Sequence, residues 1–338
     1  MGYRVAIVGA TGMVGQEFIK VLEKRDFPMD SVSLLASDRS AGKIITVKGE
    51  AIEVKETAYD SFNDVDIALF SAGADISRHF APIAAQHKAI VVDNSAAFRM
   101  DPKVPLVVPE VNIEDITKHK GIIANPNCST IQMVVALYPL HQVNPIKRIV
   151  VTTFQAVSGT GINAVDELRT QTRQLLDGQK AVAHVYSHQI AFNVLPEIDV
   201  FLDSGYTKEE WKMLEETRKI MHADNIQVSA TCVRVPVFTG HSEAITVEFE
   251  RPMEPEQARD ILLRSPGIKV LDETAVKLYP HPWLATGTDE VFVGRIRKDI
   301  SSPNGLVMWV VADNVRKGAA LNAVQIAEEL VNRGMIGG

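Results

Sequence analysis

The chain has 338 residues, of which 46% are hydrophobic and 23% charged, a composition that suits a globular protein with room for two domains. The net charge of -7, with no basic run beyond Arg297-Lys298, argues against a nucleic-acid or anionic-membrane surface. Two cysteines are too few for a disulfide framework, and neither a transmembrane run nor a signal-peptide pattern is present. We therefore expect a cytoplasmic protein whose partners are small molecules.

The chain begins with the pattern of a dinucleotide-binding unit. The apolar run Tyr3–Val8 predicts a strand, which is followed by the turn Gly9-Ala10-Thr11-Gly12-Met13-Val14-Gly15 and an amphipathic helix. Such glycines let a diphosphate approach backbone N–H groups at the helix N-terminus. Their spacing differs from the usual G-x-G-x-x-G, so packing of the helix on the sheet stays open as the alternative explanation.

A second strand, predicted over Val32–Ala36, ends in a polar segment placed to select the cofactor. In this segment an arginine, two serines and a lysine favour the 2′-phosphate of NADP: Arg39, Ser37, Ser40 and Lys43. Asp38 would favour NAD if its carboxylate faced the ribose. A solvated charged loop is the remaining alternative.

Strands and helices then alternate as far as residue 127. We predict strands over 66–70, 89–92 and 121–124, and a helix over 77–87. This alternation predicts an α/β protein with an N-terminal Rossmann-type domain, built on a parallel sheet with helices on both faces. Beyond residue 128 we expect an α+β domain, with strands over 148–157, 228–237, 244–250, 291–297 and 306–312, and helices over 164–176, 208–221 and 255–263. A last helix over 317–331 is expected to return to the first domain.

Cys128 is the candidate nucleophile. In Asn125-Pro126-Asn127-Cys128-Ser129-Thr130, short polar residues lead into a helix predicted over 131–140. The N-terminus of a helix favours a thiolate and can hold an oxyanion beside it. A buried structural cysteine is the alternative, but Asn-Pro-Asn is typical of turns and caps. Cys232 lies in an alternating strand and is predicted to be a core residue.

A thiol nucleophile needs a base near neutral pH, and imidazole supplies one. His241 follows Gly240 in a loop directly after the strand that carries Arg234. The chain has nine histidines, and one chosen by position alone is more often structural, so this assignment is a hypothesis. Gln155 follows a strand whose end is rich in small residues, which suits close approach to a ligand.

Together these motifs resemble aspartate-semialdehyde dehydrogenase along the whole chain. The matching segments are Gly9–Gly15, Ser37–Lys43, Val92-Asp93-Asn94-Ser95 through Arg99, Pro126–Thr130, Gln155–Gly159, Glu216–Lys219, Cys232–Pro236 and Gly240–Glu243. The resemblance implies an NADP-binding Rossmann domain of residues 1–127 and 315–338, and a catalytic and dimerisation domain of residues 128–314. It also implies a homodimer or tetramer without a metal, which converts L-aspartyl 4-phosphate into L-aspartate 4-semialdehyde and phosphate in lysine, threonine and methionine biosynthesis.

The same resemblance assigns the catalytic residues and the cofactor contacts. Cys128 is implied as the nucleophile that forms a thioester, His241 as the general acid/base, and Gln155 as the group that orients the thioester. The residues implied to contact NADP are Gly9, Thr11, Gly12, Met13, Val14, Ser37, Arg39, Ser40, Ser158, Gly159 and Asn314.

The resemblance also assigns the substrate residues, among which it includes Asn127. Arg234 is implied to grip the α-carboxylate with its planar guanidinium, and Glu216 to bind the ammonium group. Arg99 and Lys219 are implied to bind phosphate. Without the resemblance, Glu216 and Lys219 are explained equally well as a helical i, i+3 surface pair.

The stretch Gln179–Ile190 is shorter than the resemblance leads us to expect, which would truncate a loop at the dimer interface. It lies outside the catalytic motifs, so the departure bears on oligomer geometry more than on chemistry.

Two other functions stay open. N-acetyl-γ-glutamyl-phosphate reductase has the same reaction logic, but its acylated substrate amine would have no use for Glu216. A non-catalytic NADPH-binding regulator would tolerate the loss of Cys128 or His241, and the chain retains both.

Overall fold

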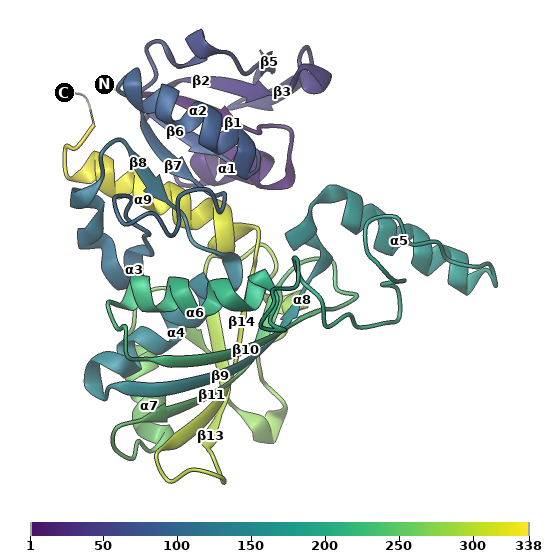
Figure 1. Cartoon of the computed structure of the whole chain (residues 1–338), viewed down its shortest axis with the longest axis vertical. Coiled ribbons are helices and arrows are strands. Elements are labelled where there is room, and N and C mark those ends of the chain that lie inside the picture. The colour runs from purple at the N-terminus through teal and green to yellow at the C-terminus, as the bar shows by residue number, and fades with distance from the viewer. Residues whose placement is uncertain (1, 337–338) are drawn as a thin grey trace. The chain divides into compact units, whose positions relative to one another are not determined.

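The structure is a computed structural model, and it describes residues 2–336. Its contacts divide the chain into two compact units (Figure 1). The first unit contains the residues up to Asn127 and those from Ala319 onward, and the second unit is Cys128–Gly318. The chain thus returns to the first unit between Gly318 and Ala319, near the domain boundary predicted at residue 315.

The first unit is built on a six-stranded sheet with the order β5-β2-β1-β6-β7-β8. All of its pairs are parallel, as predicted. The order runs outward from β1 in both directions, so β1 and β6 flank the switch point at which such sheets bind ligands. The strands are β1 (Tyr3–Val8), β2 (Met29–Ala36), β5 (Lys55–Glu56), β6 (Ile67–Phe70), β7 (Ile90–Asp93) and β8 (Ile122–Ala124).

Each face of this sheet has its own apolar core, because successive side chains of a strand point to opposite faces. Val5 and Ile7 belong to the core that includes helices α1 (Met13–Lys24) and α9 (Leu321–Asn332). Ala6 and Val8 belong to the other core, together with α2 (Ala74–Gln86). Helices therefore cover both faces, which is the predicted Rossmann-type arrangement. The last helix begins later than predicted, since Arg316–Ala320 form a π-helical turn.

A small hairpin that the sequence analysis did not predict follows β2. Its strands, β3 (Ile44–Val47) and β4 (Glu50–Glu53), pair antiparallel. Lys48 and Gly49 connect them, both with positive φ, the conformation that a tight hairpin turn requires. Short helices, α3 (Pro109–Asn112) and the 3-10 turn Ile113–Lys118, lie between β7 and β8.

The second unit has a mixed six-stranded sheet with the order β10-β9-β11-β14-β13-β12. The pairs β10 with β9 and β12 with β13 are parallel, whereas the other pairs are antiparallel. The α+β class predicted for this part is confirmed. The strands are β9 (Ile146–Gln155), β10 (Gln227–Arg234), β11 (His241–Phe249), β12 (Ile268–Val270), β13 (Val291–Lys298) and β14 (Gly305–Ala312).

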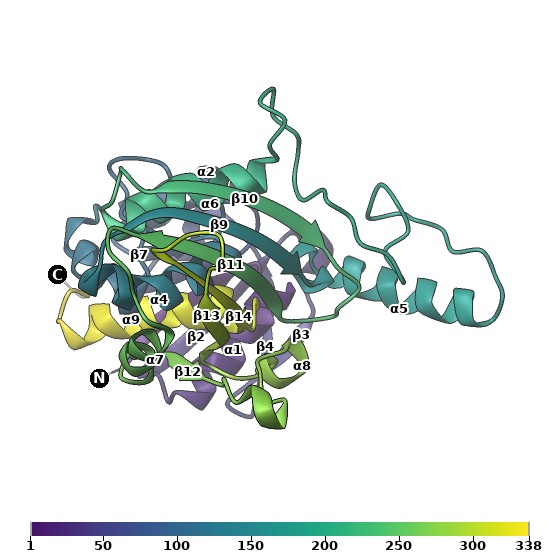
Figure 2. The same cartoon turned by 90° about the horizontal axis from the view of Figure 1, so that it is seen from below.

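Helices α4 (Cys128–Val143), α6 (Lys208–Met221) and α7 (Pro255–Leu263) pack against this sheet. Helix α4 is buried at every position from Ser129 to Leu137, as befits a helix inside the unit. Helix α5 (Ile162–Leu176) instead extends away from the sheet, and Figure 2 shows it beside the long segment that follows it. The remaining short helix is α8 (Pro282–Ala285).

Strand register brings the predicted catalytic residues of this unit to one edge of the sheet. Gln155, the last residue of β9, pairs with Arg234, the last residue of β10. His241 begins β11, which runs antiparallel to β9, and pairs with Ala312 at the end of β14. Figure 2 shows β10, β9 and β11 side by side. These ends converge although the residues are far apart in sequence.

Candidate functional site

A cavity of about 530 Å³ opens in the first unit, at the carboxyl ends of β1, β2 and β6. This is the switch point of the sheet, where dinucleotides bind in such folds. Five of the predicted cofactor residues line the cavity: Gly9, Thr11, Gly12, Ser37 and Arg39. The hydroxyl of a sixth, Ser40, accepts a hydrogen bond of 3.3 Å from the Thr11 hydroxyl, and Met13 and Val14 begin α1.

The turn after β1 needs glycine because other backbone lies directly against it. Gly9 has a φ of 89°, and a Cβ there would lie 2.3 Å from the Ser71 carbonyl oxygen. A Cβ on Gly15 would lie 2.2 Å from the Gly9 carbonyl oxygen, so α1 packs closely on the turn. Gly12 caps α1 without a side-chain hydrogen bond, and the first turn has no acidic residue. The N-terminal N–H groups of α1 thus suit a phosphate.

Asp38 and Arg39 also line this cavity. The Asp38 carboxylate accepts a hydrogen bond of 2.7 Å from the backbone N–H of Arg39, at the start of the 3-10 turn Asp38–Ser40. One of its oxygens is therefore committed to its own loop. The Arg39 side chain is exposed at the cavity.

Arg99, the predicted phosphate residue, is buried in the first unit and held by backbone carbonyls. Its Nε donates to Asn125 O and its Nη2 to Asn94 O, both at 2.9 Å. The Asn125 amide donates to Asn94 Oδ1 at 2.7 Å and itself accepts from Asn322 of α9 at 2.7 Å. Asp93 accepts hydrogen bonds from nearby serines, and burial raises the pKa of its carboxyl. This network orders the loop that carries Arg99. Asn127, which ends the first of the two segments that form this unit, is also buried.

In the second unit, α4 begins at Cys128, so the predicted position of the thiol at a helix start is confirmed. Cys128 is partly exposed. A Cβ on Gly318 would lie 2.8 Å from Cys128 Cβ. Gly318 is in turn held by a hydrogen bond of 3.0 Å from its N–H to Asp313 O, just after β14. The segment that follows β14 thus lies directly on Cys128.

His241 is the first residue of β11 rather than a loop residue, and its side chain is fully buried. Its Nδ1 accepts a hydrogen bond of 3.0 Å from the Ala156 N–H, so the proton of the neutral ring lies on Nε2. Burial and the nearby Arg234 hold the pKa of His241 well below its usual value. Nε2 has no hydrogen-bond partner among residues 2–336. The site therefore presents an imidazole N–H donor.

Arg234 presents a second such donor beside it. Its Nη1 donates to Ala156 O at 2.8 Å, whereas its buried Nε makes no hydrogen bond within the described part of the chain. A Cβ on Gly159 would lie 3.0 Å from Arg234 Nη1 and 3.2 Å from His241 Nε2. The side chains of Arg234 and His241 thus both lie directly next to Gly159. Two buried donors without partners in the described part of the chain, on side chains that meet at Gly159, indicate a ligand with carboxylate or carbonyl oxygens.

Gln155 contacts an acidic residue that the sequence analysis missed. Its amide donates to Glu209 Oε1 at 3.1 Å and to Thr153 Oγ1 at 3.3 Å. Glu209 lies in the first turn of α6, is 5% exposed, and has Lys212 Nζ 3.2 Å from its other oxygen. The structure does not show Glu216 at this place: it lies seven residues further along α6 and is also buried, and Lys219 follows it.

The other predicted residues of this unit take clear positions. Ser158 Oγ donates to Asn314 Oδ1 at 3.0 Å, and the Gly240 N–H donates to the same oxygen at 2.9 Å. Asn314 therefore ties Ser158 to the turn before His241. Cys232 is fully buried, and burial raises the pKa of its thiol, which confirms it as a core residue.

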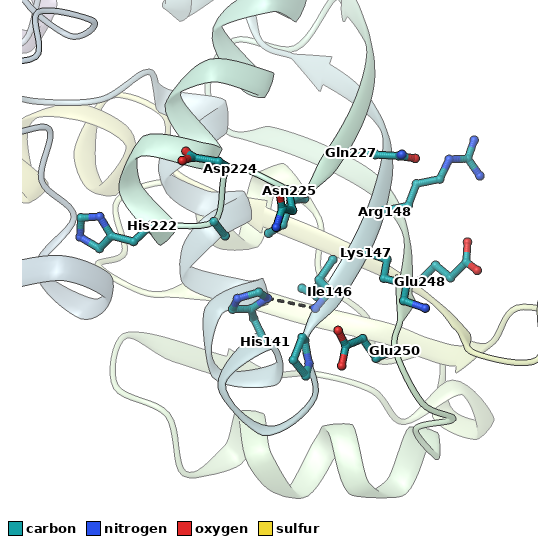
Figure 3. A pocket seen from close by; sticks show the side chains of 13 residues that line it. His141, Ile146, Lys147, Arg148, His222, Asp224, Asn225, Gln227, Glu248 and Glu250 are labelled. Atoms are coloured by element: carbon teal, nitrogen blue, oxygen red, sulfur yellow. Dashed lines mark hydrogen bonds between the residues drawn. The ribbon is translucent and has the colours of Figure 1, made fainter.

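A second cavity of the same unit, of about 650 Å³, lies at the opposite ends of β9, β10 and β11. Figure 3 shows its lining, where His141 Nδ1 accepts the Ile146 N–H at 3.0 Å. Charged side chains of both signs surround it. In the strand register, Arg148 of β9 lies opposite Gln227 of β10 and Glu248 of β11. None of the predicted site residues lines this cavity, so it is separate from the strand ends that carry Gln155, Arg234 and His241.

Two kinds of feature are absent from the described residues. No helix formed by residues 2–336 has the length and apolar character needed to cross a membrane. Over the same residues, no group of three or more His, Cys, Asp or Glu side chains is arranged to hold a metal ion.

The fold and these residues define a class: a Rossmann-type dinucleotide-binding unit followed by a mixed-sheet unit with a cysteine at a helix start. Comparison with known proteins agrees. Residues 4–119 match the semialdehyde dehydrogenase NAD binding domain, and residues 137–317 match the semialdehyde dehydrogenase dimerisation domain. The chain is 60% identical to aspartate-semialdehyde dehydrogenase of Aquifex aeolicus, over 99% of this chain and 100% of that one. It therefore belongs to the aspartate-semialdehyde dehydrogenase family.

Other relatives and solved structures agree with this assignment. The Bacillus subtilis enzyme is 51% identical over 97% of each chain. Aspartate-semialdehyde dehydrogenase II of Vibrio cholerae, solved in complex with ASA, has a TM-score of 0.95 and 50% identity over 98% of this chain and 99% of that one. A Candida albicans relative solved with NADP has a TM-score of 0.77 and 29% identity, over 99% of this chain and 100% of that one.

Proposed function

We propose that this protein is an NADP-dependent aspartate-semialdehyde dehydrogenase that works through a thioester on Cys128. It interconverts L-aspartate 4-semialdehyde plus phosphate with L-aspartyl 4-phosphate, and biosynthesis of lysine, threonine and methionine draws on the reductive direction. It acts in the cytoplasm as a homodimer. The observation that carries the proposal is a pair of buried donors, Arg234 Nε and His241 Nε2, that have no hydrogen-bond partner among residues 2–336 and belong to side chains that meet at Gly159.

The residues of the first unit fit NADP. The tight turn Gly9–Gly15 and the N-terminus of α1 suit the diphosphate, and Arg39 is exposed at the cavity to meet the 2′-phosphate. Asp38 has one oxygen committed to its own loop, which favours NADP over NAD. When bound, NADP supplies the hydride acceptor of the oxidative direction. The NADP complex of the Candida albicans relative supports this cofactor.

Arg39→Ala should raise the Kd for NADPH about tenfold or more and change the Kd for NADH little. The lost contact is a charge-assisted hydrogen bond to the 2′-phosphate, which only NADPH carries. Fluorescence titration with each cofactor measures the two affinities, and Lys43→Ala in the same segment is the comparison variant. Equal weakening of both cofactors would mean that Arg39 is structural.

In the oxidative direction, the Cys128 thiolate adds to the aldehyde carbon. The positive end of α4 favours the thiolate and stabilises the oxyanion that forms. His241 Nε2–H donates a hydrogen bond to that oxygen. To accept a proton at Nε2, His241 must first exchange tautomers, at the expense of its hydrogen bond from Ala156 N–H. Loss of hydride from that carbon re-forms its carbonyl group, and the carbon–sulfur bond made in the first step becomes that of a thioester. Phosphate attacks this carbon, the carbon–sulfur bond breaks, and the thiolate is restored.

Arg234 and Gly159 provide for the other end of the substrate. The planar guanidinium matches the α-carboxylate, and its Nε has no hydrogen-bond partner among residues 2–336. Gly159 leaves space there that any larger residue would fill.

For the substrate ammonium we propose Glu209 in place of Glu216. The Glu209 carboxylate contacts Gln155, and Gln155 pairs with Arg234 across the strands, so the acid lies at the same edge of the sheet as the carboxylate-binding residue. Lys212 lies one turn later on α6, next to Glu209. We propose it as the phosphate-binding lysine in place of Lys219.

Glu209→Gln should raise the KM for aspartate semialdehyde about ten- to a hundredfold, since a charge-assisted contact to the ammonium is lost. Glu216→Gln, the matched change two turns further along α6, should leave this KM within about twofold. Steady-state kinetics decide, with the melting temperature of each variant as the check on folding. A larger effect of Glu216→Gln on KM would restore Glu216 as the ammonium residue.

The test of the function is NADPH formation from aspartate semialdehyde, phosphate and NADP. N-acetylglutamate semialdehyde and glyceraldehyde 3-phosphate serve as the comparison substrates. We expect turnover with aspartate semialdehyde to exceed that with either of them. Preference for N-acetylglutamate semialdehyde would identify the protein as an N-acetyl-γ-glutamyl-phosphate reductase. Absence of turnover would favour a non-catalytic NADPH-binding regulator.

A further inference from the structure

The segment Gln179–Ile190 has a defined position against α5. Glu167 Oε2 accepts the backbone N–H groups of residues 184 and 185 at 2.7 and 2.6 Å. Gln171 Oε1 accepts those of residues 190 and 191 at 3.0 and 3.1 Å. Both side chains are buried. Two residues of α5 thus hold the segment on either side of its middle.

Tyr186 lies between these two anchors and contacts the proposed substrate site. Arg234 Cζ lies 5.9 Å from the centroid of the Tyr186 ring, over its face. The Tyr186 hydroxyl donates a hydrogen bond of 3.0 Å to Thr160 Oγ1, next to Gly159. Burial raises the pKa of Tyr186, so the phenol is neutral at physiological pH. The ring is therefore held by the hydrogen bond of its hydroxyl to Thr160 and by the contact of its face with Arg234.

The ring and the backbone constrain different parts of the guanidinium. Nη1 is fixed by Ala156 O, and the aromatic face attracts the cation without using any of its N–H groups. Nε is left without a partner among the described residues. Carboxylate recognition by arginine depends on the orientation of the guanidinium plane, because the two hydrogen bonds are parallel.

We propose that Tyr186 is a positioning residue for the substrate carboxylate, because its ring fixes the plane in which Arg234 presents its N–H groups. The inference rests on the proposed function, in which Arg234 binds the α-carboxylate of aspartate semialdehyde. Selectivity for aldehydes that carry an α-carboxylate thus depends on a side chain from the segment Gln179–Ile190.

The test compares Tyr186→Leu and Tyr186→Phe with the wild type. Tyr186→Leu removes the aromatic face and should raise the KM for aspartate semialdehyde about five- to thirtyfold, with KM for phosphate and NADP within about twofold. Tyr186→Phe keeps the ring and should stay within about threefold. Activity with 3-aminopropanal, which lacks the carboxylate, should be equal in all three proteins. Tyr279→Leu, the same change at an exposed tyrosine of this unit, is the control.

A second variant disturbs the contact between Tyr186 and Arg234 indirectly. Glu167→Ala removes one anchor of the segment without touching Arg234, and it should reproduce the selective rise in KM for aspartate semialdehyde. An unchanged KM in Tyr186→Leu, or in Glu167→Ala if Tyr186→Leu does not fold, would overturn the inference. So would equal losses for aspartate semialdehyde and 3-aminopropanal. A wild type without turnover on aspartate semialdehyde would instead contradict the proposed function, and the inference with it.

Discussion

Cys128→Ser should fold and bind NADP like the wild type and lose at least about a thousandfold in kcat. A serine hydroxyl is a far weaker nucleophile at neutral pH, because the helix N-terminus assists ionisation of a thiol but cannot bring an alcohol into the titrating range. Steady-state turnover gives kcat, and a fluorescence titration shows whether NADP still binds.

Chemical modification supplies the matched control for this variant. Iodoacetamide should alkylate Cys128, which is partly exposed, and spare Cys232, which is buried with a raised thiol pKa. Cys232→Ser should leave kcat within about threefold. Turnover near the wild-type rate in Cys128→Ser would remove Cys128 from the mechanism.

Gly318→Ala should lower kcat about a hundredfold. The new methyl group would lie 2.8 Å from Cys128 Cβ, a contact too short to persist, so either the start of α4 or the segment after β14 must move. A displacement of about 1 Å at a nucleophile costs on the order of a hundredfold in rate. Alanine has a higher helix propensity than glycine, so a change in helix propensity cannot explain the expected loss of kcat. The alkylation rate of Cys128 should change with kcat.

Overpacking of this kind also costs about 1–3 kcal/mol of stability, which needs a separate control. Gly178→Ala provides it: Gly178 has a φ of 71° and open space around its Cα, so alanine there strains the backbone and touches nothing in the site. Its kcat should match the wild type. A wild-type kcat and alkylation rate in Gly318→Ala would show that Cys128 does not depend on this close contact.

Much of the fold could be predicted because its signals are local. The bounds of α6 agree with prediction, since Thr207 accepts a hydrogen bond from the Glu210 N–H and the Glu210 carboxylate accepts one from the Thr207 N–H. Those of α7 agree as well, with Pro255 at its first position. The β3 and β4 hairpin was missed because its strands are short and mostly exposed, which leaves no clear alternation of apolar residues.

The same distinction applies to the site. Cys128 could be placed from the polar residues that precede its helix, a local pattern. Glu209 could not be distinguished from Glu216, because each of these two acids is followed three residues later by a lysine. Only the contact of Glu209 with Gln155 on β9 separates them, and that contact arises from packing. Tyr186 lies in a segment without regular structure, where no periodic signal exists.

The measurement that tests the thioester most directly is mass spectrometry of the enzyme after incubation with aspartate semialdehyde and NADP in the absence of phosphate. We predict an aspartyl adduct on the peptide that contains Cys128, absent from Cys128→Ser and discharged when phosphate is added. NADPH formation without any adduct on Cys128, or an adduct that phosphate does not discharge, would contradict the account.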